Sequence, residues 1–272
     1  MDWLTEPFSY AFLQKALAAV LLAGLNCALV GTYVVLRRMA FLGGALGHTI
    51  LPGVAFAFLK GFSLFFGALG ASLATALGVA ALSSQKRVRE DTAIGVVLAG
   101  MFALGILLMS MASSYRDFES IVFGSVLGVT SADLMIVAAV TVLIIVVLAL
   151  WHKELELTSL DPEYARVIGI EPNRMRLLVL LLASLAVVSA VQVVGALLTI
   201  ALLITPAACA ALIMRSVSGI MVLSSAVAVF SGFAGLLLSY HFDVSSGACI
   251  VLVATGCFLL VWCYRFLRPQ GH

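Results

Sequence analysis

Long apolar segments, bounded by small clusters of lysine and arginine, fill most of this 272-residue sequence. Each is close in length to the roughly 20 apolar residues that a helix needs to cross the hydrocarbon core of a membrane. The stretch after Arg176 is too long for one helix, and we divide it near residues 189–194. The sequence therefore predicts nine spans, or eight if that division is wrong: 9–36, 43–59, 62–83, 92–112, 132–151, 177–190, 194–214, 217–239 and 248–264.

The composition points to lipid as the main solvent of the chain. Apolar residues make up 63% of the sequence and charged residues 10%, with a mean hydropathy of +1.20. Soluble domains are about half apolar and about a quarter charged, and a soluble fold of this size could not hide so much apolar surface from water. We therefore expect a single all-α, polytopic membrane bundle over residues 1–272, surrounded by membrane lipid.

The basic clusters predict the orientation of the bundle. Cytoplasmic loops carry an excess of Lys and Arg, so we place these clusters on the cytoplasmic side, with the N-terminus outside and the C-terminus inside. Residues 1–7 lack the basic flank of a signal peptide, so the first span is expected to be retained. The net charge of +2 is too even to suggest nucleic-acid binding.

Residues 43–53 (GGALGHTILPG) combine helix-breaking residues with an ionisable group. Pro52 cannot donate to the carbonyl of His48, so a helix break is expected here, where the backbone must be buried in protein or line a wet cavity. His48 lies roughly 15 Å along a helix from Arg38, near the middle of the membrane. An ionisable group at that depth is a functional candidate, and imidazole is a common ligand of transition metals. The alternative is a packed histidine bonded to a neighbouring carbonyl.

A second proline interrupts the segment 194–210. Pro206 has no N–H to donate to the carbonyl of Leu202, so a second helix break is expected at this point. Small residues around it favour close helix packing, with a pore-lining role for Thr199, Thr205 or Cys209 as the alternative.

The longest cytoplasmic loop, about residues 152–176, contains the signals of one short helix. Asp161 suits the N-cap, Pro162 the first helical position and Gly169 the C-terminal cap. Tyr164, Val167 and Ile168 then share one face. Such a helix either docks a protein partner or lies on the lipid surface.

The outer loop that joins the last two spans contains His241 and Asp243. The two side chains could share a cation, but a transition-metal site needs more than two groups, and a solvated loop is the favoured interpretation. The sequence contains no G-x-x-x-x-G-K-[ST] phosphate-binding loop, no H-E-x-x-H and no G-x-S-x-G. Five cysteines form no C-x-x-C pair and are interpreted as buried thiols.

Several motifs, taken together and in order, resemble the permease subunits of bacterial ABC importers for manganese, zinc or iron. The resemblance covers nearly the whole chain. It is carried by residues 36–43 (LRRMAFLG) through His48 to 52–53, 90–95 (EDTAIG), 100–105 (GMFALG), 161–169 (DPEYARVIG), 194–207 and 243–248 (DVSSGA).

The resemblance implies a transport subunit of the bacterial inner membrane rather than an enzyme. It implies that two permease chains, identical or different, pair around a path for Mn²⁺ or Zn²⁺, or else Fe²⁺. Two separate ATP-binding cassette subunits would drive transport, and an extracytoplasmic metal-binding protein would deliver the ion. This chain would bind no cofactor of its own. The residues that match the ATPase-coupling helix are Asp161, Glu163, Tyr164, Ala165 and Gly169.

His48 matches the histidine that this family places in the metal path, but the family commonly has Asp four residues earlier, where this chain has Gly44. Positions 44 and 48 share a helix face, so Asp and His there would hold one ion together. With Gly44, either His48 works with groups of the paired chain, or the ion is held more loosely, or this chain is the weaker half of a heterodimer.

Three other functions are alternatives for this sequence. A secondary carrier or channel would need no ATPase, but the spans hold no series of carboxylates for a proton relay. A structural membrane subunit would have no path of its own. An intramembrane enzyme would need a nucleophile paired with a base, and the sequence shows none.

Overall fold

The computed structural model describes residues 11–84, 88–111 and 128–267. Within these residues all regular structure is helical. The helices are α2 (Ala11–Leu36), α3 (Phe41–Thr49), α4 (Leu51–Lys60), α5 (Leu64–Ser83), α6 (Glu90–Ser110), α8 (Ser131–Leu150), α9 (His152–Leu160), α10 (Pro162–Val167), α11 (Pro172–Val194), α12 (Ala196–Ile213), α13 (Val217–Phe242) and α14 (Ser246–Leu267).

The predicted spans are confirmed in number and in order. Nine helices of the described part of the chain are long and apolar enough to cross a membrane, with α3 and α4 together forming the span Phe41–Lys60. The long stretch after Arg176 is divided at Gly195, between α11 and α12. Its first helix begins at Pro172, five residues before the predicted start at 177, because proline fits the first turn of a helix.

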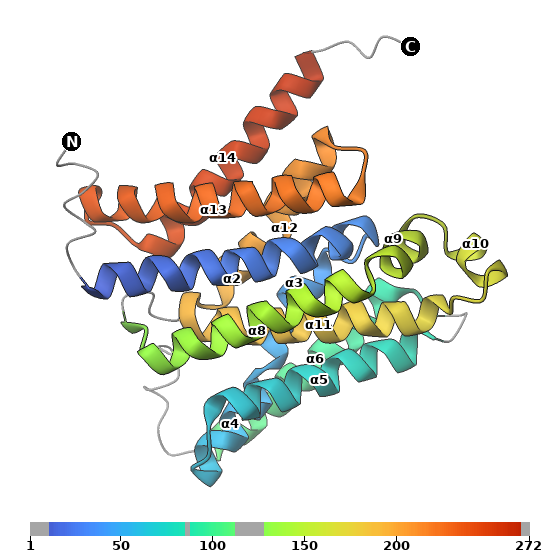
Figure 1. Cartoon of the computed structure of the whole chain (residues 1–272). Helices are drawn as coiled ribbons and strands as arrows, with labels where there is room; N and C mark the ends of the chain where they lie inside the picture. The colour runs from blue at the N-terminus through green and yellow to red at the C-terminus, as the bar shows by residue number, and fades with distance from the viewer. Residues whose placement is uncertain (1–10, 85–87, 112–127, 268–272) are drawn as a thin grey trace.

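Helix α2 lies at the centre of the bundle. It packs against α12, α13, α11 and α8, while α4, α5 and α6 form a second group that joins the first through α11 and α3. Figure 1 shows α13 and α2 side by side, with α5 and α6 at the opposite edge of the molecule. Helix α14 packs on α12 and α13, and its last turns extend beyond the bundle (Figure 1).

Glycine allows two of these helices to touch at the backbone. A Cβ atom on Gly53 of α4 would lie 2.0 Å from the carbonyl oxygen of Gly67 on α5, and one on Gly67 would lie 2.4 Å from that of Gly53. Both are impossible distances for a side chain, so the hairpin of α4 and α5 depends on glycine at both positions. This close approach is typical of small-residue packing between membrane helices.

Contacts between distant helix ends bring the basic clusters together at one end of the bundle. The Arg37 guanidinium donates to Thr158 and Ser159 of α9, and the Arg176 guanidinium donates to the carbonyl of Ser83 at the end of α5. The basic ends of the helices therefore lie together, beside α9 and α10. The amino ends of α2 and α8 meet elsewhere, where Lys15 donates to Ser131 over 3.0 Å.

Candidate functional site

The span that carries His48 is broken, as residues 43–53 predict. Helix α3 ends at Thr49, Ile50 joins the two helices, and Pro52 occupies the first turn of α4. Pro52 has no N–H to donate to the carbonyl of His48, and this carbonyl accepts the N–H of Ile50 instead. Gly105 of α6 packs against this break, since a Cβ there would lie 2.8 Å from the Cβ of Leu51. The break therefore rests directly on α6.

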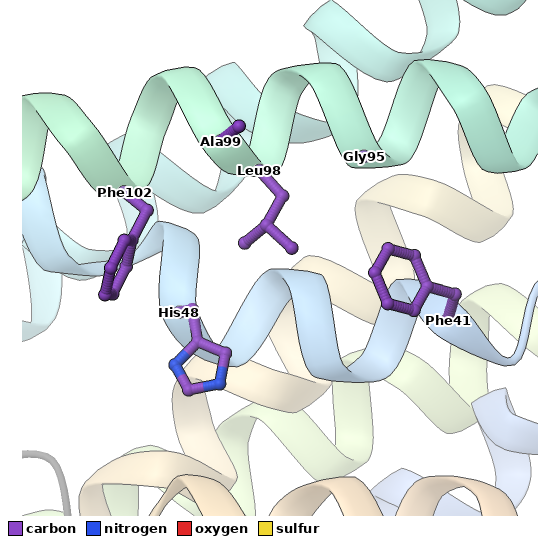
Figure 2. A pocket seen from close by; sticks show the side chains of 6 residues that line it. All are labelled: Phe41, His48, Gly95, Leu98, Ala99 and Phe102. Carbon is purple, nitrogen blue, oxygen red and sulfur yellow. The ribbon is translucent and has the colours of Figure 1, made fainter.

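A groove between α3 and α6 contains the imidazole of His48. Its volume is about 370 Å³, and its lining residues are Phe41, His48, Gly95, Leu98, Ala99 and Phe102. Figure 2 shows Phe41 and His48 on α3, with Leu98 and Phe102 on α6 across from them. The Phe102 ring meets the imidazole edge-on, with ring centroids 6.0 Å apart and planes at 81°. His48 is the only polar side chain of the lining, so its nitrogens are the groove's only side-chain atoms that can coordinate a metal ion through a lone pair.

The position one turn before His48 is open. A Cβ atom on Gly44 would meet no atom within 4 Å, and the His48 side chain is exposed. Among the described residues, no three His, Cys, Asp or Glu side chains gather where they could hold a metal ion. In the described part of the chain, this groove therefore offers a single imidazole with space beside it, which is too few ligands for a transition-metal site.

The second candidate pair, His241 and Asp243, lies at the end of α13. Nδ1 of His241 is 2.9 Å from the carbonyl oxygen of Leu237, and its ring packs against Tyr240 with centroids 5.3 Å apart. Asp243 is exposed and ends the helix in the left-handed conformation, with φ 51°. Within the described part of the chain, no third metal-ligating side chain joins this pair.

The predicted helix break at Pro206 is wrong. Helix α12 continues from Ala196 to Ile213 with Pro206, which is buried, inside it. The break lies at Gly195, whose φ of 82° and ψ of 164° belong to a region that essentially only glycine adopts. Proline removes one hydrogen bond from a helix, and membrane helices tolerate this loss where neighbouring helices pack around it.

The segment predicted to be cytoplasmic, about residues 152–176, contains two helices where the sequence predicts one. Helix α9 precedes the predicted helix, which is α10. Asp161 caps α10, its Oδ1 accepting the N–H groups of Glu163 at 3.1 Å and Tyr164 at 2.9 Å. Ala165 is buried, and its carbonyl accepts the N–H of Ile170 beside Gly169, which has φ 89°. The predicted apolar face is exposed, at 55% for Tyr164, 82% for Val167 and 50% for Ile168.

The sequence did not predict that α6 forms a wall of the groove. Glycines in membrane helices commonly permit close packing between helices, and Gly105 does so against Leu51. A Cβ atom on Gly95, however, would meet no atom within 4 Å, and this glycine lines the groove instead. An open glycine and a packed glycine look the same in one sequence, so only the neighbouring helix distinguishes them.

Comparisons with known proteins agree with this architecture. The ABC 3 transport family (ABC-3) matches residues 9–265. The chain is 40% identical over 271 residues to the manganese transport system membrane protein MntC of Listeria monocytogenes, covering 100% of this chain and 96% of that protein. It is 36% identical over 267 residues to a probable iron transport system membrane protein of Haemophilus influenzae, covering 98% of each.

A solved structure, PsaBC from Streptococcus pneumoniae in complex with Fab, has the same fold. The TM-score is 0.85 at 34% identity, and the match covers 99% of this chain and 96% of that one. The family match spans most of the sequence, and the nine apolar helices make the chain a multi-pass membrane protein. This chain is therefore a membrane permease that belongs to the ABC 3 transport family.

Proposed function

We propose that this chain is the permease subunit of an ATP-driven importer for a divalent transition metal in the bacterial inner membrane, with Mn²⁺ the favoured ion and Zn²⁺ or Fe²⁺ the alternatives. The observation that carries the proposal is an exposed imidazole inside a broken span, at the edge of an otherwise apolar groove. The names of the similar proteins, manganese and iron transport membrane proteins, support Mn²⁺ and Fe²⁺ among these ions.

The incomplete ligand set of the groove supports pairing with a second permease chain. A single imidazole binds a divalent ion weakly, and transition metals require several ligands. The outward side of α6 is apolar and exposed, with Val96 at 60% and Leu107 at 59%. A second chain, identical or different, would cover this side and bring further ligands toward His48.

The helix pair α9 and α10 is proposed as the surface that contacts an ATP-binding cassette subunit. Two such subunits, which are separate chains, would bind the two paired permease chains. Asp161 fixes the start of α10, and the exposed side chains Leu160, Tyr164 and Val167 form an apolar surface beside it. Exposed apolar side chains on a capped helix are typical of a docking surface. ATP hydrolysis would then occur on those subunits, and an extracytoplasmic binding protein would deliver the metal on the opposite side.

Transport follows from this arrangement in physical terms. A divalent ion cannot enter hydrocarbon without replacing its water ligands, and a neutral imidazole offers one lone pair at that depth. The apolar walls Phe41, Leu98 and Phe102 offer no competing ligand that would trap the ion. His48 would therefore act as a transient ligand, which lets the ion leave when the paired chains change conformation.

Reconstitution tests the proposal. The permease is placed in liposomes with its ATPase and binding-protein subunits, and uptake of Mn²⁺, Zn²⁺ and Fe²⁺ is measured with and without ATP. We expect ATP-dependent uptake that is strongest for Mn²⁺ and falls at least about tenfold in His48→Ala. Uptake that proceeds without ATP would favour a secondary carrier, and equal uptake by His48→Ala would remove the imidazole from the path.

A further inference from the structure

Three charged side chains meet where four helices end on the cytoplasmic side. Arg37 follows α2, Glu90 begins α6, and Arg176 lies in the second turn of α11. The Arg176 guanidinium also donates to the carbonyls of Ser83 at 3.2 Å and Ala80 at 3.4 Å, at the end of α5. The side chains of Arg176 and Glu90 are only 17% and 28% exposed, so water screens this cluster weakly.

Arg37 connects this cluster to α9. Its Nη2 donates to the Thr158 hydroxyl at 2.8 Å, and its Nε donates to the Ser159 hydroxyl at 3.1 Å. Both hydroxyls in turn donate to carbonyls of α9 itself, Thr158 to Glu154 at 2.7 Å and Ser159 to Leu155 at 2.5 Å. Their protons are therefore engaged, and their lone pairs face the guanidinium. Arg37 moves with α9 or loses two hydrogen bonds.

Glu90 lies within electrostatic reach of both arginines. Burial lowers the pKa of Arg37 to about 10, and the Glu90 carboxylate partly offsets this effect while Arg176 adds to it. The Arg37 guanidinium therefore stays charged at neutral pH. One carboxylate thus faces two buried cations, of which one belongs to α11 and the other is held by α9.

The contact between Glu90 and Arg176 is incomplete. Nε of Arg176 and Oε1 of Glu90 are 3.9 Å apart, which is too far for a hydrogen bond. Both atoms are buried and have no hydrogen-bond partner among the described residues. A buried polar atom without a hydrogen bond is costly, so a small displacement of α6 or α11 that closes the distance between these two atoms would be favourable.

Both walls of the His48 groove begin at this cluster. Helix α6, which starts at Glu90, supplies Leu98 and Phe102. The chain passes from Arg37 through Arg38, in the left-handed conformation with φ 60°, into α3 with His48. A shift of Arg37 relative to Glu90 therefore changes the separation of the two walls at their cytoplasmic ends.

We propose that Arg37 is a positioning residue that transmits movement of α9 to the groove, by drawing the Glu90 carboxylate toward itself or releasing it to Arg176. This inference rests on the proposed docking of an ATPase at α9 and α10. The linkage makes metal movement depend on ATP hydrolysis, and weakening it lets the ATPase turn over without transport.

The test measures Mn²⁺ uptake and ATP hydrolysis together in the reconstituted complex. Glu90→Gln removes the charge with little change of shape, and Asp91→Asn makes the same change at the next, exposed residue. Thr158→Val removes the hydroxyl that accepts from Arg37, and Thr158→Ser keeps it. We expect Glu90→Gln and Thr158→Val to lower the Mn²⁺ transported per ATP at least about fivefold, with Asp91→Asn and Thr158→Ser within about twofold of wild type.

An unchanged ratio in Glu90→Gln or Thr158→Val would overturn the linkage, as would an equal fall in all four variants. If the complex with Glu90→Gln does not assemble, the comparison of Thr158→Val with Thr158→Ser tests the linkage by itself. Valine is slightly larger than threonine and serine is smaller, so a difference in size alone does not explain opposite results. Failure of the proposed function looks different, because the wild-type complex would then show no ATP-dependent uptake at all.

Discussion

The hydroxyl of Tyr33 and Nδ1 of His152 are 2.8 Å apart, and this hydrogen bond joins α2 to the first residue of α9. Tyr33 is completely buried, and one turn later Arg37 makes its own bonds to α9. The central helix of the bundle therefore holds α9 at two successive turns, and a movement of α9 relative to α2 would break these hydrogen bonds.

Removing the Tyr33 hydroxyl should destabilise the protein. Tyr33→Phe leaves Nδ1 of His152 without its partner in a half-buried site, and we expect a loss of roughly 1–3 kcal/mol in the free energy of unfolding. The matched control is Ser218→Ala, which removes an exposed hydroxyl 3.0 Å from Nε2 of the same ring and should cost less than about 0.5 kcal/mol. Reversible unfolding in mixed micelles measures the free energy of unfolding of both variants. Equal losses would contradict the conclusion that the bond from Tyr33 to His152 stabilises the protein more than the bond to Ser218.

A carboxylate one turn before His48 should strengthen metal binding. Gly44→Asp introduces a side chain where a Cβ meets no atom within 4 Å, so it fits without displacing neighbours. The new carboxylate and His48 would share a helix face and offer two ligands in place of one, which should lower the Mn²⁺ concentration for half-maximal uptake about tenfold. Gly44→Asn has the same size without the charge. The idea fails if the Asn variant binds Mn²⁺ as tightly as the Asp variant.

The hairpin of α4 and α5 should tolerate alanine at one glycine and not at another. In Gly67→Ala the new Cβ would lie 2.4 Å from the carbonyl oxygen of Gly53, so the helices must separate. We expect a loss of about 1–3 kcal/mol. Gly70 is exposed on the same helix with no atom within 4 Å of a Cβ, so Gly70→Ala should be neutral or stabilise by up to about 1 kcal/mol. Thermal unfolding of the purified permease compares the two, and similar midpoints would be inconsistent with the close backbone contact.

Replacing Arg37 by lysine should make transport depend on pH. Burial lowers the pKa of Arg37 from its ordinary value to about 10. The unfolded chain therefore binds more protons than the folded chain only at a pH between about 10 and the ordinary pKa of arginine. Near neutral pH, Arg37 is charged in both states and makes no contribution to the pH dependence of stability. Lysine starts from about 10.4, and burial lowers the pKa of a buried lysine toward neutrality.

The Arg37→Lys variant should therefore couple ATP hydrolysis to Mn²⁺ uptake at low pH and lose this coupling as the pH rises, because a base is charged only below its pKa. Uptake per ATP, measured between about pH 6 and pH 9, should stay flat in the wild type. A flat profile in Arg37→Lys, at the wild-type level, would show that the charge at this position is not needed.

The sequence alone predicted nine spans in this order, with eight as the alternative, together with the break at Pro52 and the cap at Asp161. Each depends on residues that are neighbours in the chain: about 20 apolar residues cross a bilayer, proline removes a local hydrogen bond, and an aspartate accepts from the next N–H groups. The incorrect break at Pro206 shows the limit of local reasoning, because the packing around a proline decides whether the helix continues through it.

Only the tertiary structure decided which residues of other helices contact the functional side chains. Phe102 is 54 positions from His48, and the hydrogen bond from Arg37 to Ser159 joins residues 122 positions apart. Membrane helices are all similarly apolar, so hydropathy does not select which of them pack together. Two features decide which helices pack together. Glycines allow the backbones of two helices to approach closely, and the few polar side chains form hydrogen bonds between helices where no water is present.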